Sequence, residues 1–220
     1  MVFLKIYSKY KTYSMVSKDI FIENLYLCKN LAPADGCVVE CGVWKGGMSA
    51  AMAEVLGPHR RYYLFDSFEG MPPAKKIDGE SALKWQQDVK SPNYFDNCRI
   101  DAGYAQDAMH LSNASHYQLI KGWFSETLPS FKPEEPIAVL RIDSDWYDST
   151  LGCLNSLYKY IDRGGLIIID DYNYWDGCPR AVHDFLSTNK LIERINQSRN
   201  GVTFIIKNEK LQPFDKGVTL

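Results

Sequence analysis

The chain has 220 residues, of which 45% are hydrophobic and 24% charged, so it can bury one sizeable core. That composition excludes a disordered tail, a collagen-like fibre and a low-complexity scaffold. With 25 basic and 27 acidic residues, the net charge of −2 provides no overall field to hold a polyanion. We interpret the lysines near the N-terminus as a solvated face and expect neither a nucleic-acid nor a membrane partner; they are Lys5, Lys9, Lys11 and Lys18.

The six cysteines contain no CxxC pair and no zinc-finger spacing, so we expect buried free thiols and no disulfide scaffold. Cys37 and Cys41 share one face of a predicted strand but lie about 13 Å apart, which is too far to bridge. No apolar run approaches the roughly 20 residues of a membrane span, and the charged N-terminus lacks the hydrophobic region of a signal peptide. A cytoplasmic protein is therefore expected.

Strands and helices alternate along the chain. A helix is predicted over residues 15–31, followed by a strand over 37–40, a helix over 48–56 and a strand over 62–65. After an irregular segment come a helix over 104–111, strands over 117–120 and 137–142, a helix over 150–160, a strand over 166–169, a helix over 180–186 and a strand over 202–206. The buried apolar runs favour an α/β fold with a doubly wound, mostly parallel, Rossmann-like sheet in one domain, residues 1–220.

Residues 67–100 depart from this alternation. They are polar, contain Pro72-Pro73 and Ser91-Pro92, and show no sustained periodicity. A segment of this length inside a compact domain is usually functional. We therefore predict a lid insertion that covers a ligand.

Acidic residues end four of the predicted strands: Glu40, Asp66, Asp143 and Asp170. Ligands of such sheets gather at the carboxyl ends of the strands. A glycine-rich turn follows the first of these residues, and Gly42 would let its backbone turn sharply. The turn matches neither GxGxxG nor the phosphate-binding loop. Asp66 is either a ribose-binding acid or a cap beside Ser67, and we favour the ribose role.

The acids that follow two later strands are Asp143, Asp145, Asp170 and Asp171. Adjacent parallel strands would bring these four carboxylates together, which is costly unless a cation or a proton intervenes. Oxygen ligands without His or Cys suit Mg²⁺, with Mn²⁺ or Ca²⁺ as alternatives. The other interpretation is a pair of helix caps, a role that Asp148, Ser149 and Thr150 could already fill.

No catalytic nucleophile is evident, because the chain has no GxSxG elbow and no recognisable triad. His183 follows Asp171 in a predicted helix and could reach the site. Several aromatic residues near the strand ends could stack on an adenine or a sugar ring; they are Trp123, Trp146, Tyr147, Tyr172, Tyr174 and Trp175.

Five motifs in order resemble the macrocin O-methyltransferase family: VECGVWKGGMS (39–49), FDSFEGMP (65–72), GWFSETLP (122–129), LRIDSDWYDST (140–150) and GGLIIIDDYNYWDGCPRAV (164–182). Enzymes of that family depend on S-adenosylmethionine and Mg²⁺, and they methylate sugar hydroxyls of macrolide and aminocoumarin antibiotics. The resemblance covers residues 14–206.

The resemblance implies a role for each matching position. The cofactor-binding set is Glu40, Cys41, Gly42, Val43, Trp44, Ser49, Asp66, Ser67, Phe68, Gly122 and Trp123. The Mg²⁺ ligands are Asp143, Asp170 and Asp171. An N-terminal helical and lid segment, residues 1–35, includes a stretch at 13–16 that resembles the family's lid near the cofactor.

Methyl transfer from a sulfonium is an in-line displacement, so the acceptor oxygen must be aligned and lose its proton. Mg²⁺ would acidify a sugar hydroxyl, and we expect Asp145 to be the general base, with Asp143 as the alternative. The expected partner is a small-molecule hydroxyl acceptor, a glycoside by resemblance, and a homodimer is left open.

This sequence departs from the family pattern DGDLYEST at Ser144 and Trp146, which leaves the acceptor open. A catechol or phenolic acceptor is the nearest alternative. A non-catalytic cofactor-binding protein and a Rossmann dehydrogenase are the alternatives from other classes. A dehydrogenase would not need these carboxylates, and a pseudo-enzyme would typically have lost one of them.

Overall fold

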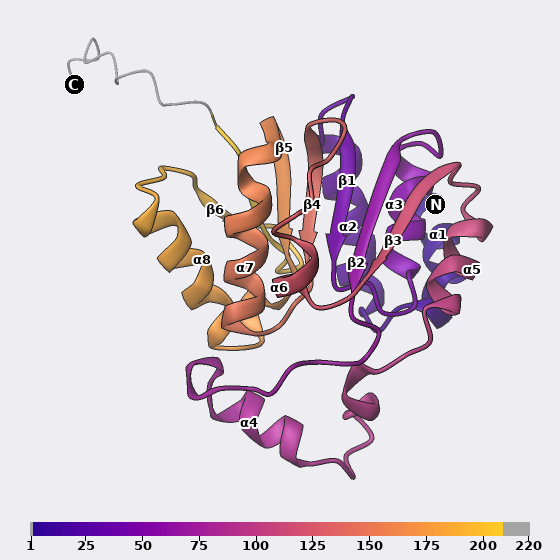
Figure 1. Ribbon diagram of the computed structural model, residues 1–220. Coiled ribbons are helices and arrows are strands. Elements are labelled where there is room, and N and C mark those ends of the chain that lie inside the picture. The colour runs from indigo at the N-terminus through magenta and orange to yellow at the C-terminus, as the bar shows by residue number, and fades with distance from the viewer. Residues whose placement is uncertain (1, 209–220) are drawn as a thin grey trace, which may run out of the picture.

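The computed structural model describes residues 2–208, and within them seven strands form one sheet in the order β3-β2-β1-β4-β5-β7-β6 (Figure 1). The strands β1 (Cys37–Cys41), β2 (Arg61–Asp66), β3 (His116–Lys121), β4 (Ile137–Ile142) and β5 (Ile161–Ile169) are parallel. β7 (Thr203–Ile206) runs antiparallel to β5, and β6 (Ile195–Gln197) antiparallel to β7. The strand order reverses between β1 and β4, where open α/β sheets bind ligands.

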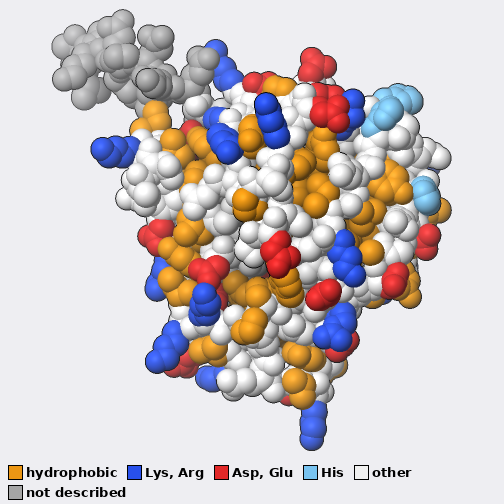
Figure 2. Space-filling model, in the orientation of Figure 1, with side chains coloured by type: hydrophobic (Ala, Val, Ile, Leu, Met, Phe, Trp, Pro, Cys, Tyr) orange, Lys and Arg blue, Asp and Glu red, His pale blue; other side chains and the backbone are white. Residues whose placement is uncertain are grey.

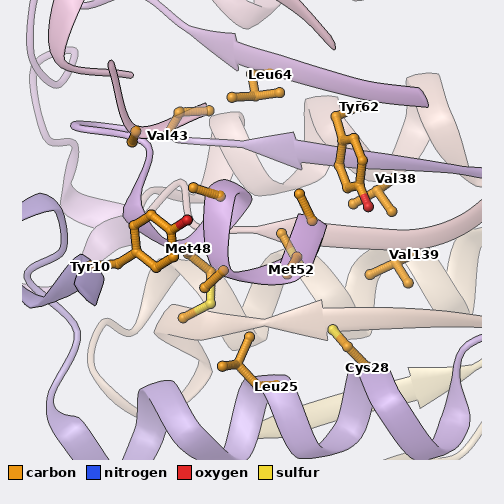
Figure 3. Packing of buried hydrophobic residues seen from close by; sticks show 14 of the residues in the cluster. Tyr10, Leu25, Cys28, Val38, Val43, Met48, Met52, Tyr62, Leu64 and Val139 are labelled. Atoms are coloured by element: carbon orange, nitrogen blue, oxygen red, sulfur yellow. The ribbon is translucent and has the colours of Figure 1, made fainter. Parts of the chain in front are cut away.

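Helices cover both faces of this sheet. In Figure 1, α2 (Lys18–Leu31) and α3 (Gly47–Leu56) lie on one side, and α7 (Tyr147–Leu157) and α8 (Gly177–Thr188) on the other. Neighbouring strand residues point to opposite faces, so Val38 joins the core under α3 and Val39 the core under α7. Figure 3 shows Met48 and Met52 of α3 gathered with side chains of α2 and the sheet. The predicted doubly wound α/β fold is confirmed.

The N-terminal segment, predicted as helical without bounds before residue 15, begins with a separate helix, α1 (Val2–Tyr10). Ile6 and Tyr10 are buried, and the Tyr10 hydroxyl donates a hydrogen bond to Glu54 of α3 at 2.6 Å. Lys5 and Lys9 are exposed, as expected for a solvated face, and Lys9 pairs with Glu54 at 2.5 Å. The lysines and tyrosines obscured the apolar face of this helix.

The insertion at residues 67–100 has its own secondary structure. It contains α4 (Glu80–Gln87) and two 3-10 turns, Lys76–Asp78 and Phe95–Cys98, and it projects below the sheet in Figure 1. Its two arms are joined by side-chain amides: Gln86 donates to the carbonyl oxygen of Pro72 at 2.9 Å, and Asn97 to that of Met71 at 2.8 Å. The eight residues of α4 are too few to show a clear period in the sequence. The role of the insertion as a lid stays a prediction.

Several boundaries differ from those predicted. Helix α2 begins at Lys18, not at residue 15. Helix α7 is Tyr147–Leu157 and is followed by a 3-10 turn, Tyr158–Tyr160, whereas one helix is predicted over 150–160. Strand β5 begins at Ile161, not at residue 166, and the short β6 is not among the predicted strands. Two short helices complete the chain, α5 (Gly103–Leu111) and α6 (Phe124–Thr127).

All six cysteines are free thiols. Five are buried as expected, but Cys98 is only half-buried because it lies in the insertion. No helix within residues 2–208 is long and apolar enough to cross a membrane.

Candidate functional site

The glycine-rich turn after β1 lies directly against the end of β4. Gly42 has φ +87°, and a Cβ built on it would come within 1.6 Å of the carbonyl oxygen of Asp143. The backbone N–H of Asp143 donates to the carbonyl oxygen of Cys41 at 2.8 Å. Glycine is required here because both the dihedral angle and the close approach exclude a side chain. The turn and the first acid of the DSD motif are therefore a single structural unit.

Asp66, at the end of β2, holds this turn through its carboxylate. Its Oδ2 accepts hydrogen bonds from the backbone N–H groups of Val43 (2.7 Å) and Trp44 (2.8 Å). Its Oδ1 accepts one from the N–H of Phe68 at 2.7 Å. Trp44 and Phe68 have φ of 47° and 55°, left-handed values that are uncommon outside glycine. Asp66 thus fixes two strained turns, and the spare lone pairs of its oxygens remain for a ligand.

A buried arginine that the sequence analysis overlooked joins three of the predicted acids. Arg141, in β4, is 1% exposed, and its Nη1 donates to Glu40 Oε1 and to Asp143 Oδ2, each at 2.8 Å. Its Nη2 forms an ion pair with Asp170 Oδ1 at 2.6 Å, and its Nε donates to Asn24 Oδ1 at 3.2 Å. A single cation inside the apolar run IAVLRI, next to an acidic motif, was the signal that could have revealed this role. The positive charge of Arg141 helps these acids to lie close together.

Burial raises the pKa of the acids around Arg141. For Glu40 it raises the pKa to about 7, against the opposing effect of Arg141 and of the hydrogen bond from the Ser49 hydroxyl. For Asp170 burial raises the pKa to about 6, although Arg141 lowers it. Desolvation therefore outweighs pairing at both positions. These carboxyl groups favour a bound proton or a further cation.

The acids whose oxygens lie close enough to share a metal ion are Asp143, Asp145 and Asp171. One carboxylate oxygen from each lies within 4.8 Å of the other two. The expected ligand set contained Asp170 where this group contains Asp145. The difference arises because Asp170 begins a 3-10 turn (Asp170–Asn173) and pairs with Arg141, whereas Asp171 accepts a hydrogen bond from the Asp145 N–H at 3.0 Å.

Asp145 has an unusual backbone conformation and a raised side-chain pKa. Its φ is 57°, in the left-handed region. Burial, followed by the charge of Asp143, raises its pKa to about 7. Burial, followed by the charge of Asp145, also raises the pKa of Asp171 well above its usual range. Backbone strain and raised pKa values at one place indicate a functional site.

Three tryptophans connect this group to the insertion. The Trp175 indole N–H donates to Asp145 Oδ1 at 2.8 Å, and the Trp146 N–H donates to the Pro72 carbonyl oxygen at 2.9 Å. The ring of Trp85, from α4, lies 6.3 Å from that of Trp146 and 6.1 Å from that of Trp175. Trp146 and Trp175 are two of the aromatic residues that could stack on a ligand, and here they pack on each other, with ring centroids 5.3 Å apart.

A cavity of about 660 Å³ opens at this edge of the sheet. Both DSD carboxylates line it, as do residues 70–75 of the insertion and Met15. From the predicted cofactor set, its lining includes Gly42, Trp44, Asp66, Ser67, Gly122 and Trp123. The other predicted site residues lie outside its lining: Glu40, Cys41, Val43, Ser49, Phe68, Asp170 and Asp171. The exposed His183 also lies outside it and pairs with the Tyr172 hydroxyl at 2.8 Å.

The surface around this edge carries mixed charge. On the face shown in Figure 2, Lys and Arg side chains alternate with Asp and Glu among the described residues. The acidic site is thus a local feature of a nearly neutral molecule.

The family model described as macrocin O-methyltransferase (TylF) matches residues 11–205. This chain belongs to the macrocin O-methyltransferase family. One curated relative, from Streptomyces olivaceus, is named 8-demethyl-8-(2,3-dimethoxy-alpha-L-rhamnosyl)-tetracenomycin-C 4'-O-methyltransferase. It is 35% identical over 175 residues, which cover 74% of this chain and 64% of that protein. A second, demethyldecarbamoylnovobiocin O-methyltransferase from Streptomyces niveus, is 31% identical over 82% of this chain and 71% of its own length.

Among solved structures, the O-methyltransferase NovP superposes with a TM-score of 0.73 at 21% identity, covering 90% of this chain and 83% of that one. The fold of this macrocin O-methyltransferase family member is therefore the Rossmann-like fold of class I methyltransferases. The resemblance inferred from its five motifs is confirmed.

Proposed function

We propose that this protein transfers a methyl group from S-adenosylmethionine to a hydroxyl of a sugar or a glycosylated natural product. One observation carries the proposal: the glycine turn that Asp66 holds and the carboxylates of Asp143 and Asp145 line the same cavity. Two relatives of this chain are named as O-methyltransferases, and the name of one specifies a rhamnosyl compound. A cavity with negative charge at one end suits a positively charged sulfonium.

The chemistry of the cavity lining fits S-adenosylmethionine, which supplies an electrophilic methyl group. Asp66 has spare oxygen lone pairs for ribose hydroxyls, and Trp123 supplies an aromatic wall for adenine. Gly42 and Trp44 border the same space. Ser49 and Glu40, hydrogen-bonded to each other behind it, hold the turn in place.

The donor set also fits Mg²⁺, a hard cation that prefers carboxylate oxygens. Asp143 and Asp171 would hold it, since they belong both to the expected ligand set and to the observed group. The third expected ligand is Asp170, which pairs with Arg141. When bound, Mg²⁺ supplies positive charge that makes a nearby hydroxyl more acidic.

Asp145 is the proposed general base. Trp175 donates to Oδ1 of this carboxylate, which holds the side chain in one orientation. A pKa raised to about 7 by burial suits proton abstraction near neutral pH. The chain's part in the reaction is to align the acceptor oxygen for in-line displacement and to take up its proton.

A catechol or phenolic acceptor is the second candidate. The aromatic side chains of Trp44, Trp123 and Phe124 in the cavity lining favour it. In that case the same carboxylates would act on a more acidic hydroxyl.

An acceptor screen with methyl-labelled S-adenosylmethionine tests the proposal. The screen covers glycosides, free sugars and catechols, with a reaction without protein as the control. Label on a sugar hydroxyl is the expected outcome. Label on catechols alone supports the second candidate, and no label on any acceptor contradicts both.

A further inference from the structure

Helix α7 begins directly after the DSD motif, and its first N–H group is capped from a distant part of the chain. Trp146, the residue before the helix, forms no side-chain capping bond. The backbone N–H of Tyr147, the first residue of the helix, instead donates to Asp78 Oδ1 at 2.7 Å. Asp78 lies in the insertion, 69 positions earlier. The candidates for this cap in the sequence analysis, residues 148–150, lie inside the helix.

The second oxygen of the Asp78 carboxylate also accepts a hydrogen bond. Asp78 Oδ2 accepts from the backbone N–H of Lys75 at 2.7 Å, which closes the 3-10 turn Lys76–Asp78. Asp78 is 2% exposed, so both hydrogen bonds are shielded from water. The loss of this carboxylate would leave two backbone N–H groups unpaired, which is costly for buried groups. Asp78 therefore joins the insertion firmly to α7.

Two Asp-Gly pairs interlock at this contact. A Cβ built on Gly177, at the start of α8, would come within 2.3 Å of Asp78 Oδ1. A Cβ built on Gly79 would come within 2.3 Å of Asp176 Oδ2. Figure 1 shows the segment before α4 near the lower ends of α7 and α8. The start of the insertion is thus packed against the first residues of both helices.

These contacts fix the chain directly after Asp145. The insertion accepts the indole N–H of Trp146 at 2.9 Å as well as the backbone N–H of Tyr147 at 2.7 Å. On the other side of Asp145, the backbone N–H of Asp143 is bound to the end of β1. The left-handed backbone of Asp145, with φ of 57°, lies between these two fixed points. A strained residue keeps its conformation only while the structure around it is held in place.

We propose that Asp78 is a positioning residue for methyl transfer: by capping α7 from the insertion, it keeps Asp145 in the conformation of the proposed base. This inference rests on the proposed function and adds to it a residue that lies in none of the five motifs. Asp78 also lines the cavity. The rival interpretation is therefore a direct contact between Asp78 and the acceptor.

The kinetics of Asp78→Ala separate positioning from binding. With a glycoside that the acceptor screen identifies, we expect kcat to fall about 10- to 100-fold, because a displaced base slows the chemical step. KM for the acceptor and the Kd of S-adenosylhomocysteine, measured by calorimetry, should stay near wild type. Asp78→Asn keeps an acceptor oxygen for a backbone N–H and should recover most of the loss in kcat. Asp88→Ala, at an exposed position of the same insertion, is the matched control and should behave as wild type.

The tryptophan indole N–H groups report the same displacement without any reaction. The chain has five tryptophans, and single Trp→Phe variants assign their NMR resonances. In Asp78→Ala the indole resonances of Trp146 and Trp175 should shift, because the first group donates to the insertion and the second to Asp145. The resonance of Trp123, which lines the same cavity, should not shift. Asp88→Ala should leave all five resonances unchanged.

Gly177→Ala displaces Asp78 without removing its charge, so it should shift the same two resonances, and it takes the place of Asp78→Ala if that variant does not fold. A wild-type kcat in folded Asp78→Ala would overturn the inference, as would an unshifted Trp175 resonance. A raised KM for the acceptor with unchanged kcat would also overturn it and would support the rival contact. Absence of methyl transfer by the wild-type protein would instead contradict the proposed function, and the NMR measurement would still decide whether Asp78 holds Asp145.

Discussion

Asp145 is held in a left-handed conformation by two hydrogen bonds. Its N–H donates to Asp171 Oδ2 at 3.0 Å, and its Oδ1 accepts from the Trp175 indole at 2.8 Å. A non-glycine residue with φ of 57° costs about 1 kcal/mol or more, so these contacts have to maintain it. Local backbone strain is thus maintained at the residue that we propose as the general base.

Asp145→Asn removes the proposed base and keeps the shape of the side chain. We expect kcat to fall about 10²- to 10⁴-fold, the usual contribution of a general base. The Kd of S-adenosylhomocysteine should stay near wild type, since the glycine turn is untouched. Asp107→Asn, at an exposed position on α5, is the control. A kcat near wild type in Asp145→Asn would exclude this residue as the base.

Arg141→Met leaves Glu40, Asp143 and Asp170 without their shared cation. We expect a loss of about 3–5 kcal/mol in the free energy of unfolding at pH 7, because buried charges are left unpaired. Urea denaturation measures this loss. It should be smaller at pH 5.5, where Glu40 and Asp170 bind protons. An unchanged unfolding free energy at pH 7 would contradict the role of Arg141.

The acids of the site could be predicted from the sequence, but their pairing could not. Each acid follows an apolar strand, and parallel strands end at a common edge. Whether Asp170 or Asp145 lies with Asp143 and Asp171 depends on where the chain leaves each strand. It also depends on Arg141, which pairs with Asp170 although the two residues are distant in sequence. One arginine in an apolar run has no period or spacing that reveals its partners.

At the scale of elements, the apolar strands and the helices of the doubly wound core were predictable because their periodicity is strong. The exceptions were the short elements α4, α6 and β6, and α1, whose apolar face is interrupted by lysines. Helix α4 depends on tertiary contacts, chiefly those of Trp85 with Trp146 and Trp175. Such contacts join residues 60 or more positions apart, so local sequence does not show them.

Trp85→Ala should loosen the insertion from the strand ends. Because Trp175 contacts both Trp85 and Asp145, we expect kcat/KM for the acceptor to fall about tenfold, with faster proteolysis of residues 67–100. Val89→Ala, which alters an exposed side chain of the same insertion, should leave both unchanged. Wild-type kcat/KM in Trp85→Ala would show that the insertion does not act as a lid.

At the scale of the whole molecule, a net charge of −2 conceals a strongly acidic site. Burial raises the pKa of Glu40 and Asp145 to about 7 and that of Asp170 to about 6. The folded state thus binds more protons than the unfolded chain between about pH 4 and pH 7. The stability contributed by these groups is fully present below the unfolded pKa values and is lost as the pH rises through the folded ones.

Without a divalent metal, we therefore expect Tm to fall as the pH rises from 5.5 to 8, because these carboxyl groups lose their protons. Mg²⁺ should restore Tm more at pH 8 than at pH 5.5, because it competes with protons for the same carboxylates. Thermal unfolding in EDTA and in Mg²⁺ at both pH values measures this effect. Asp145→Asn should reduce the difference, and an equal effect of Mg²⁺ at both pH values would contradict the coupling.

The transfer of labelled methyl to a glycoside, counted in EDTA and again after Mg²⁺ is restored in excess, tests the account most directly. It joins the cofactor, the carboxylates and the sugar acceptor in one reaction. We predict that label transfer is lost in EDTA and returns with Mg²⁺. Undiminished transfer in EDTA, or no transfer to any glycoside with Mg²⁺ present, would contradict it.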